Sequence, residues 1–373
     1  MIKWGDILKD ILVLTVGTSL YNNLKKTNNL MEWDVNKGVE YLREIDLETK
    51  VAGAEINTVL SLIKDNILVP KKAYLISSNT VDGILASEII KNIMIEKLKF
   101  NEVDIVKVEN LNPSNLHDFS KKGLKNLVSE ISKIITKHSN VSELCFAPIG
   151  GFKTQIFMVG LMAQIYGISS YYMYENFKSV TEILPLPISF DNQLYIDNVN
   201  FFNMLDCNNI VDEQEVLSYI KKEPQLKNLI EYEKMDNIKY VSLSPMGNLY
   251  FYTVTDKVKS NLPEICNKKN GIISASKEAH ANEMINNTEI QTFLNQILSN
   301  LYVEKIITNY YNPDNKGDIV KIRLKGEQLV FEFNHKKGML GGVIYTTAKT
   351  KEQREAVKVE LELELISYKY VVK

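Results

Sequence analysis

The sequence predicts an α/β protein in three parts: a doubly wound parallel sheet, a small helical or winged connector, and a small α+β unit with an antiparallel sheet. Two observations carry this prediction. Up to residue 205, short and nearly continuous apolar runs alternate with longer helical periods, as in a parallel sheet whose two faces are both buried. Towards the end of the chain the runs instead alternate apolar with polar residues and are joined by short turns. We place the parts at residues 1–205, 206–275 and 276–373.

The first part contains five apolar runs that suit buried strands. They lie at residues 10–18, 73–77, 103–109, 144–149 and 170–174. Helical periods fill the intervals, at residues 55–66, 81–97, 115–137 and 152–166. This alternation is typical of a Rossmann-like doubly wound parallel sheet, in which ligands bind at the carboxyl ends of the strands.

The connector and the terminal part have weaker patterns. In the connector we expect short charged helices at 212–222 and 225–235, then a strand, a turn, and a strand or helix over 239–253. In the terminal part we expect a helical segment over 277–302, an antiparallel meander of four strands, a helix over 351–360 and a β-like tail. The four strands are predicted at 303–311, 318–324, 328–334 and 340–347.

The composition excludes several classes of protein. With 45% apolar residues, 17 glycines and 9 prolines among 373 residues, the chain is neither disordered nor collagen-like. No run approaches the ~18 to 20 apolar residues of a membrane span, and the first residues lack the pattern of a signal peptide, so we expect a cytoplasmic protein with no membrane partner. Cys145, Cys207 and Cys266 are scattered, which predicts buried thiols and no disulfide framework or zinc site.

Two glycine-rich turns carry the chemistry of the first part. One contains Gly17, Thr18 and Ser19 directly after the first strand, and the other is the run GGFKT at residues 150–154. Backbone N–H groups in such turns, and the positive end of the helix that follows, can hold a phosphate group. Neither turn matches the Walker P-loop or the dinucleotide fingerprint, which disfavours an ordinary NTPase or dehydrogenase. Similar turns also occur in α/β proteins that bind no ligand there.

These segments resemble the CARF domain of CRISPR-associated effector proteins. The resemblance is carried by LTVGTSLYNN, by SSNTVDGILASEII and, most specifically, by FAPIGGFKTQ followed by YMYENF and LPLPISF. CARF domains bind cyclic oligoadenylates, which type III CRISPR complexes make, across a two-fold dimer. The resemblance therefore implies a homodimer and an allosteric activator such as cyclic tetra-adenylate (cA4), with no other cofactor.

The resemblance also implies which residues bind the ring. They are Gly17, Thr18, Ser19, Ser78, Asn79, Thr80, Gly150, Gly151, Lys153 and Thr154, with Glu175 and Asn176 as further candidates. Some CARF domains slowly cleave their own ligand, and here Lys153 and Ser19 are the candidates for that reaction.

CARF domains are joined to different output modules, and the arginines discriminate among them. The HEPN ribonuclease needs an Arg followed closely by a His. The chain has three arginines, Arg43, Arg323 and Arg354, and none has a His at that spacing. The HEPN class is therefore excluded.

A metal-dependent PD-(D/E)xK nuclease is a second possible output. It needs an Asp, a Glu and a Lys clustered on a β-core to hold a divalent cation. Asp318 and Glu332 have a suitable spacing, but Asn334 stands where the motif requires Lys, and Lys336 would have to substitute from beyond a turn. This alternative stays open at the level of sequence.

The terminal part resembles a RelE-like mRNA interferase in the order of its elements. Residues 316–358 carry ten basic and five acidic side chains, whereas the whole chain has a net charge of −2. Such a local excess of positive charge suits an anionic partner, although a solvated lysine-rich face has the same composition. RelE-like enzymes cut mRNA in the 30S A site of the ribosome without metal. The resemblance implies these catalytic residues: Arg354, Arg323, Lys321, Lys349 and Lys351.

Three further candidates concern proton transfer in that domain. Tyr345 or Tyr368 would take the place of the tyrosine often found near the end of RelE-like domains, and His335 is either an acid–base group or a solvated turn residue. The sequence thus predicts a cA4-activated, metal-independent, ribosome-dependent endoribonuclease of type III CRISPR antiviral defence, with a ribosomal protein as a candidate recruiting partner. A CARF transcription regulator with a winged helix over 239–253 is the non-enzymatic alternative.

Overall fold

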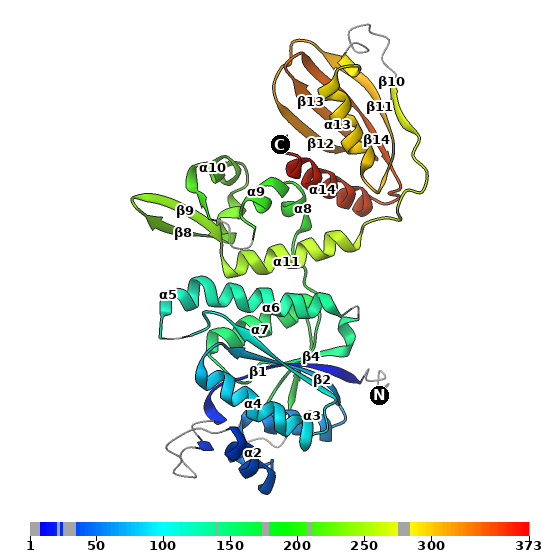
Figure 1. The fold of residues 1–373 in the computed structure, drawn as a ribbon. Helices are drawn as coiled ribbons and strands as arrows, with labels where there is room; N and C mark the ends of the chain where they lie inside the picture. The colour runs from blue at the N-terminus through cyan, green and yellow to red at the C-terminus, as the bar shows by residue number, and fades with distance from the viewer. Residues whose placement is uncertain are drawn as a thin grey trace. The chain divides into compact units, whose positions relative to one another are not determined.

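A computed structural model of the chain describes residues 8–20, 23–24, 35–112, 114–138, 140–173, 179–206, 210–274 and 284–372. The chain forms two compact units (Figure 1). One comprises Met1–Phe190 with Ser244–Thr253, and the other comprises Asp191–Leu243 with Val254–Lys373. Residues 191–205, which the sequence analysis places in the first part, therefore pack within the second unit.

The first unit is built on a six-stranded sheet. Its strands are β1 (Lys9–Thr15), β2 (Leu68–Ser78), β3 (Glu102–Val108), β4 (Leu144–Ala147), β5 (Ser170–Tyr172) and β6 (Thr181–Ile183). Their order is β3-β2-β1-β4-β5-β6; β1 to β5 are parallel, and β6 runs antiparallel to β5. The parallel sheet is confirmed with all five predicted strands, whereas β6 was not expected. The order reverses between β1 and β4, which places a crevice at their carboxyl ends.

Helices cover both faces of this sheet (Figure 1). They are α2 (Val35–Glu44), α3 (Gly53–Lys64) after a 3-10 turn at Lys50–Ala52, α4 (Val81–Glu96), α5 (Leu116–Asp118), α6 (Leu124–Lys137) and α7 (Lys153–Tyr166). Alternate residues of β1 point into separate cores. Leu12 and Leu14 pack with α2, α3 and α4, while Ile11 and Val13 pack with α6 and α7. Side chains buried on both faces explain why the strand reads as one apolar run.

The second unit begins with helices and a small antiparallel sheet. These are α8 (Asn192–Ile196), α9 (Val199–Met204), β7 (Val211–Asp212), α10 (Glu213–Lys222), a 3-10 turn at Pro224–Leu229, β8 (Ile230–Met235) and β9 (Ile238–Leu243). The helix predicted over 225–235 is wrong in its second half. Asp236 and Asn237 both have positive φ, which closes β8 and β9 into a tight hairpin. After β9, the segment predicted as strand or helix is α11 (Pro245–Ser260), with its proline at the first helical position. The residues of α11 up to Thr253 belong to the first unit, and Leu249 is buried in its core.

The second six-stranded sheet lies at the end of the chain. Its strands are β10 (Gly271–Ser274), β11 (Val303–Asn312), β12 (Ile319–Lys325), β13 (Gln328–His335), β14 (Gly338–Thr346) and β15 (Val371–Val372), in the order β10-β11-β14-β13-β12-β15. The predicted four-strand meander is therefore corrected, because β11 pairs with β14 and not with β12. A Cβ on Gly342 would lie 2.4 Å from the Ile307 carbonyl oxygen, so a glycine in β14 is what permits this close pairing.

Two helices cover one face of this sheet: α13 (Thr288–Ser299) and α14 (Lys351–Ser367). Phe293 of α13 and Leu361 of α14 share a core with Phe331 of β13. The predicted helix over 351–360 is too short, because α14 continues to Ser367. The β-like tail predicted after it is therefore reduced to the two residues of β15. Residues 275–283, where the helical segment is predicted to begin, lie outside the described residues. Across the described part of the chain, no helix is long and apolar enough to cross a membrane.

Candidate functional site

The two predicted glycine turns meet at the carboxyl ends of β1 and β4. A Cβ on Gly17 would lie 2.6 Å from the Gly151 nitrogen, and one on Gly150 would lie 2.2 Å from the Gly17 nitrogen. The Gly150 N–H donates to the Thr15 carbonyl at 3.1 Å. Gly151 has a φ of +102°, which a side chain would strain. We call these two turns, Gly17–Ser19 and Gly150–Phe152, the glycine cradle.

A buried carboxyl group that was not predicted from the sequence supports the cradle by accepting a hydrogen bond from its first turn. Glu55 of α3 is 1% exposed, and its Oε1 accepts a hydrogen bond from the Gly17 N–H at 2.9 Å. A Cβ on Gly150 would lie 2.3 Å from the same oxygen. Burial raises the pKa of Glu55, against the opposing effect of the Gly17 hydrogen bond. Its place in the buried stripe with Val59 and Leu62 was the available signal.

Three buried polar atoms near the cradle have no hydrogen-bond partner among the described residues. They are Glu55 Oε2, the hydroxyl of Thr15 at the end of β1, and Nε2 of Gln155 in α7. The other amide atom of Gln155, Oε1, accepts from the Phe152 N–H at 3.4 Å. Buried polar atoms are almost always hydrogen-bonded in folded proteins, so these three atoms can each take a water molecule or a ligand group as a partner.

The third predicted turn caps helix α4. The hydroxyls of Ser78 and Thr80 lie 2.9 Å apart, and the Thr80 oxygen accepts from the Gly83 N–H at 3.1 Å. The Asn79 amide donates to Glu109 at 2.6 Å. These bonds give the turn the ordinary role of a helix cap. A ligand-binding role for its residues stays a prediction.

The other predicted ring-binding residues are solvent-exposed. Thr18 and Ser19 follow Gly17, and Lys153 and Thr154 form the first turn of α7. The positive end of α7 and the charge of Lys153 therefore face solvent beside the cradle, which suits an anion. Glu175 and Asn176 lie outside the described residues, as does Cys207. Of the other cysteines, Cys145 is buried as predicted, whereas Cys266 is partly exposed.

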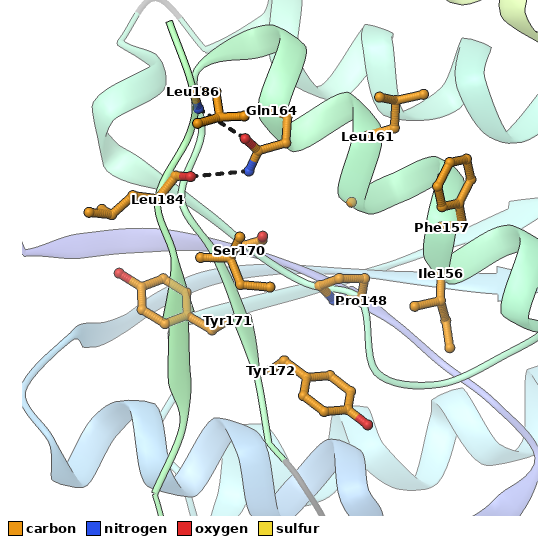
Figure 2. A pocket seen from close by; sticks show the side chains of 12 residues that line it. Pro148, Ile156, Phe157, Leu161, Gln164, Ser170, Tyr171, Tyr172, Leu184 and Leu186 are labelled. Atoms are coloured by element: carbon orange, nitrogen blue, oxygen red, sulfur yellow. Dashed lines mark hydrogen bonds between the residues drawn. The ribbon is translucent and has the colours of Figure 1, made fainter.

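An apolar hollow of about 580 Å³ begins at Pro148, just before the second turn (Figure 2). Helix α7 forms one wall, and strands β5 and β6 with the segment to Leu186 form the other. Gln164 joins the walls, because its amide donates to the Leu184 carbonyl at 3.3 Å and accepts from the Leu186 N–H at 2.9 Å. Phe157 and Leu184 are each 66% exposed. We call this surface the apolar hollow.

The second unit contains a cleft of about 650 Å³ that is rich in cations. It collects three of the five predicted catalytic residues: Lys321 and Arg323 from β12, and Lys351 from the first turn of α14. We call it the basic cleft. The charged residues that line it are Lys222, Lys321, Arg323, Lys351, Lys358, Asp197, Glu355 and Glu362.

The other two predicted catalytic residues lie together but do not line the basic cleft. The Arg354 guanidinium donates to the Lys349 carbonyl at 3.2 Å and lies 3.9 Å from a Glu327 oxygen. The side chains of α14 that line the cleft form one stripe along the helix, at Lys351, Glu355, Lys358 and Glu362. Arg354 lies next to this stripe and does not line the cleft. The catalytic role of Arg354 and Lys349 stays a prediction.

The structure does not bring Asp318 and Glu332 together as a metal site. Lys321 is in register with Glu332, and Glu332 lies 3.8 Å from Arg323, so these three side chains share one face of the sheet. Asp318 lies three residues before Lys321, and because side chains alternate faces along a strand, it belongs to the opposite face. Asp318 instead lines a separate pocket with His335. Among the described residues, no group of three or more His, Cys, Asp or Glu side chains could hold a metal ion.

The candidate proton-transfer residues are also placed. His335 is 4% exposed, so its interpretation as a solvated turn residue is wrong. Its Nε2 lies 2.5 Å from Glu289, and its Nδ1 accepts from the Lys337 N–H at 3.3 Å, which occupies both ring nitrogens. The ring of Tyr345 lies 4.4 Å from the Lys305 ammonium, and Tyr368 is half exposed at the end of α14.

Comparison with known proteins gives one match of part of the chain to a family. Residues 50–187 match the model of a CRISPR-associated protein family, Cas_APE2256. No curated protein matches.

Two solved structures are similar at low identity. One is Can2 from Sulfobacillus thermosulfidooxidans in complex with cyclic tetra-adenylate, 12% identical, with 68% of this chain and 65% of that chain covered and a TM-score of 0.25. The other is protein VC1899 from Vibrio cholerae, 9% identical, with coverage of 90% and 77% and a TM-score of 0.29. This chain thus spans less than two thirds of Can2, and TM-scores of this size carry no argument about function. What the comparisons do show is that the segment from Lys50 to Pro187, which holds Glu55 and the second glycine turn, is similar to a CRISPR-associated family.

Proposed function

We propose that the chain is a cyclic oligoadenylate-activated effector of type III CRISPR defence, with a CARF sensor in its first unit and an RNA-cutting second unit. The glycine cradle carries this proposal. It lies at the point where the strand order reverses, over three buried and unpaired polar atoms, and its second turn lies inside the segment that matches a CRISPR-associated family. The N–H groups of Gly17, Gly150 and Phe152 already donate within the protein. The exposed hydroxyls of Thr18 and Ser19, the positive end of α7 and the charge of Lys153 would bind phosphates of the ring.

We propose that the chain forms a two-fold dimer, because a cyclic tetra-adenylate ring has matching symmetry and would meet the cradle of each protomer. The apolar hollow is the proposed dimer surface. It adjoins the cradle through Pro148 and exposes Phe157, Leu184 and Leu186 by 61 to 66% each. Large exposed apolar patches of this kind usually mark interaction sites.

The basic cleft is the proposed nuclease site of the second unit. Five cations and three carboxylates line it, which gives it a positive balance suited to an RNA backbone. Lys321, Arg323 and Lys351 would hold the phosphates and stabilise charge in the transition state. Arg354 and Lys349 would contribute from beside the cleft. We propose mRNA in the 30S A site as the substrate, with a ribosomal protein as recruiting partner, and hence a cytoplasmic location.

Activation would follow from linkage between the two units. A ligand shifts a protein towards the arrangement that binds it better, by as much as its affinity differs between the two arrangements. The ring would therefore favour the dimer arrangement in which the cleft can act on RNA. In the same cradle, slow cleavage of the ring would use Lys153 and Ser19.

The test supplies the purified protein with translating ribosomes or with naked RNA, with and without cyclic tetra-adenylate, and with and without EDTA. We expect mRNA cleavage that needs both the ring and the ribosome and is unchanged by EDTA. Cleavage of naked nucleic acid that EDTA abolishes would favour a metal-dependent nuclease. Binding to duplex DNA that weakens as salt rises, with no cleavage, would favour a transcription regulator.

A further inference from the structure

The floor of the basic cleft contains an ion pair that no predicted role explains. Lys358 and Glu362 are one turn apart on α14, and both line the cleft. The Lys358 ammonium lies 2.9 Å from each carboxylate oxygen of Glu362 and donates to the Ile196 carbonyl at 2.8 Å. The side chains are 10% and 7% exposed. A buried pair of this kind gains little stability over apolar residues, so it calls for another explanation.

We propose that Glu362 is the group that accepts the proton of the ribose 2′-hydroxyl when RNA is cut in the basic cleft. This inference rests on the proposed function and names the general base that the sequence analysis sought among Tyr345, Tyr368 and His335. Each carboxylate oxygen has a second lone pair, so the bond to Lys358 leaves Glu362 able to accept a proton. Lys358 is then a positioning residue, because it holds the carboxylate and itself touches the end of α8.

The charges around Glu362 suit this role. Those that line the cleft come from four elements: Lys351, Glu355 and Lys358 from α14, Lys321 and Arg323 from β12, Lys222 from α10, and Asp197 at the end of α8. Tyr195 of α8 also interacts with Glu362, and burial raises the pKa of this tyrosine. Helix α9 packs against α14 as well and carries no charged residue. Burial raises the pKa of Glu362 to about 7, with Asp197 adding to the rise and Lys358 opposing it. A base with a pKa near the working pH transfers protons most effectively.

The proposed step balances without any co-reactant. The 2′-oxygen forms a bond to the adjacent phosphorus, and the bond from that phosphorus to the 5′-oxygen of the next nucleotide breaks. The 2′-hydroxyl proton passes to Glu362, and the leaving 5′-oxygen takes a proton from the ammonium of Lys351, which lies on the same stripe of α14. The products are a 2′,3′-cyclic phosphate and a 5′-hydroxyl, and exchange with solvent restores both side chains.

Helix α14 offers a matched control. Glu355 lies two turns before Glu362 on the same stripe, lines the same cleft and also pairs with a lysine, since Lys351 lies 3.4 Å away. Glu362→Gln and Glu355→Gln therefore each replace one lysine-paired carboxyl group of the same cleft by an uncharged amide. A purely electrostatic effect on RNA binding would appear in both variants, whereas loss of proton transfer would appear only in Glu362→Gln.

The experiment uses the full chain with cyclic tetra-adenylate and mRNA on ribosomes, and measures the single-turnover cleavage rate at a series of pH values. In the wild type we expect the rate to rise with pH through neutrality. Glu362→Gln should lower the rate about 100-fold or more and remove that rise, because general-base catalysis contributes factors of this size. Glu355→Gln should keep the rise. Ring affinity and the unfolding midpoint report whether each variant is folded.

A variant that keeps the carboxyl completes the test. If Glu362→Gln does not fold, Glu362→Asp replaces it, and it should retain a pH-dependent rise with its midpoint displaced. If a folded Glu362→Gln variant cleaves at the wild-type rate, or cleaves more slowly but keeps the increase of rate with pH, the role of Glu362 is overturned. The proposed function itself would be untouched by that result. Absence of RNA cleavage by the wild type would overturn the proposed function and this role with it.

Discussion

Glu55 provides a sharp test of how the ligand site is built. In Glu55→Ala, the buried Gly17 N–H loses its acceptor at 2.9 Å. Leaving a buried donor unsatisfied costs about 1–3 kcal/mol, which corresponds to a roughly 5- to 150-fold loss if the whole effect falls on the cradle. Glu55→Gln keeps an acceptor oxygen and has the shape of the neutral acid, so it should retain ring binding. An exposed carboxylate, changed in Glu44→Ala, serves as the control.

The pH dependence of stability follows from the same group. Because burial raises the pKa of Glu55 in the folded state, the folded protein binds this proton more tightly than the unfolded chain. The stabilisation is therefore fully present below the unfolded pKa and is lost as the pH rises through the folded value. Glu55→Gln should be less sensitive to rising pH than the wild type. Calorimetric titration with cyclic tetra-adenylate and thermal unfolding across pH measure both effects. Equal loss of ring binding in the Gln and Ala variants would refute the reasoning.

Three further predictions address the cradle, the dimer and the cleft. Gly150→Ala should abolish ring binding, because its Cβ would lie 2.2 Å from the Gly17 nitrogen; wild-type affinity by calorimetry would contradict this. Phe157→Lys should turn the proposed dimer into a monomer in analytical ultracentrifugation, since it places a charge in the apolar hollow, and an unchanged mass would argue for another interface. Arg323→Ala and Arg354→Ala should each lower mRNA cleavage at least about tenfold without changing ring affinity. Unaltered cleavage would remove that arginine from the site.

The sequence predicted the first unit well for a physical reason. Parallel strands that are buried on both faces must be apolar throughout, so β1 and β4 stand out as runs, and the glycine turns follow them directly. Glu55 was not predicted because an acidic residue in a helix is ordinarily exposed, although its spacing from Val59 and Leu62 places it on the buried face of α3.

The second unit was predicted less well because its features depend on tertiary contacts. Strand β8 is short and charged, and only the Asp236–Asn237 turn marks it. The pairing of β11 with β14 depends on the absence of a side chain at Gly342, where the two strands come close together. The residues near Gly342 in the sequence do not indicate this pairing. Likewise, the basic cleft joins α8 and α10 to β12 and α14, so Lys358 and Glu362 could not be recognised from the residues near them in sequence.

The central claim is that the glycine cradle binds a cyclic oligoadenylate, and the most direct measurement is calorimetric titration of the full chain with cyclic tetra-adenylate, with linear tetra-adenylate as the control. We expect saturable binding of one ring per two chains, and much weaker binding of the linear form. Absence of binding for cyclic rings of every size, or equal binding of linear and cyclic forms, would contradict it.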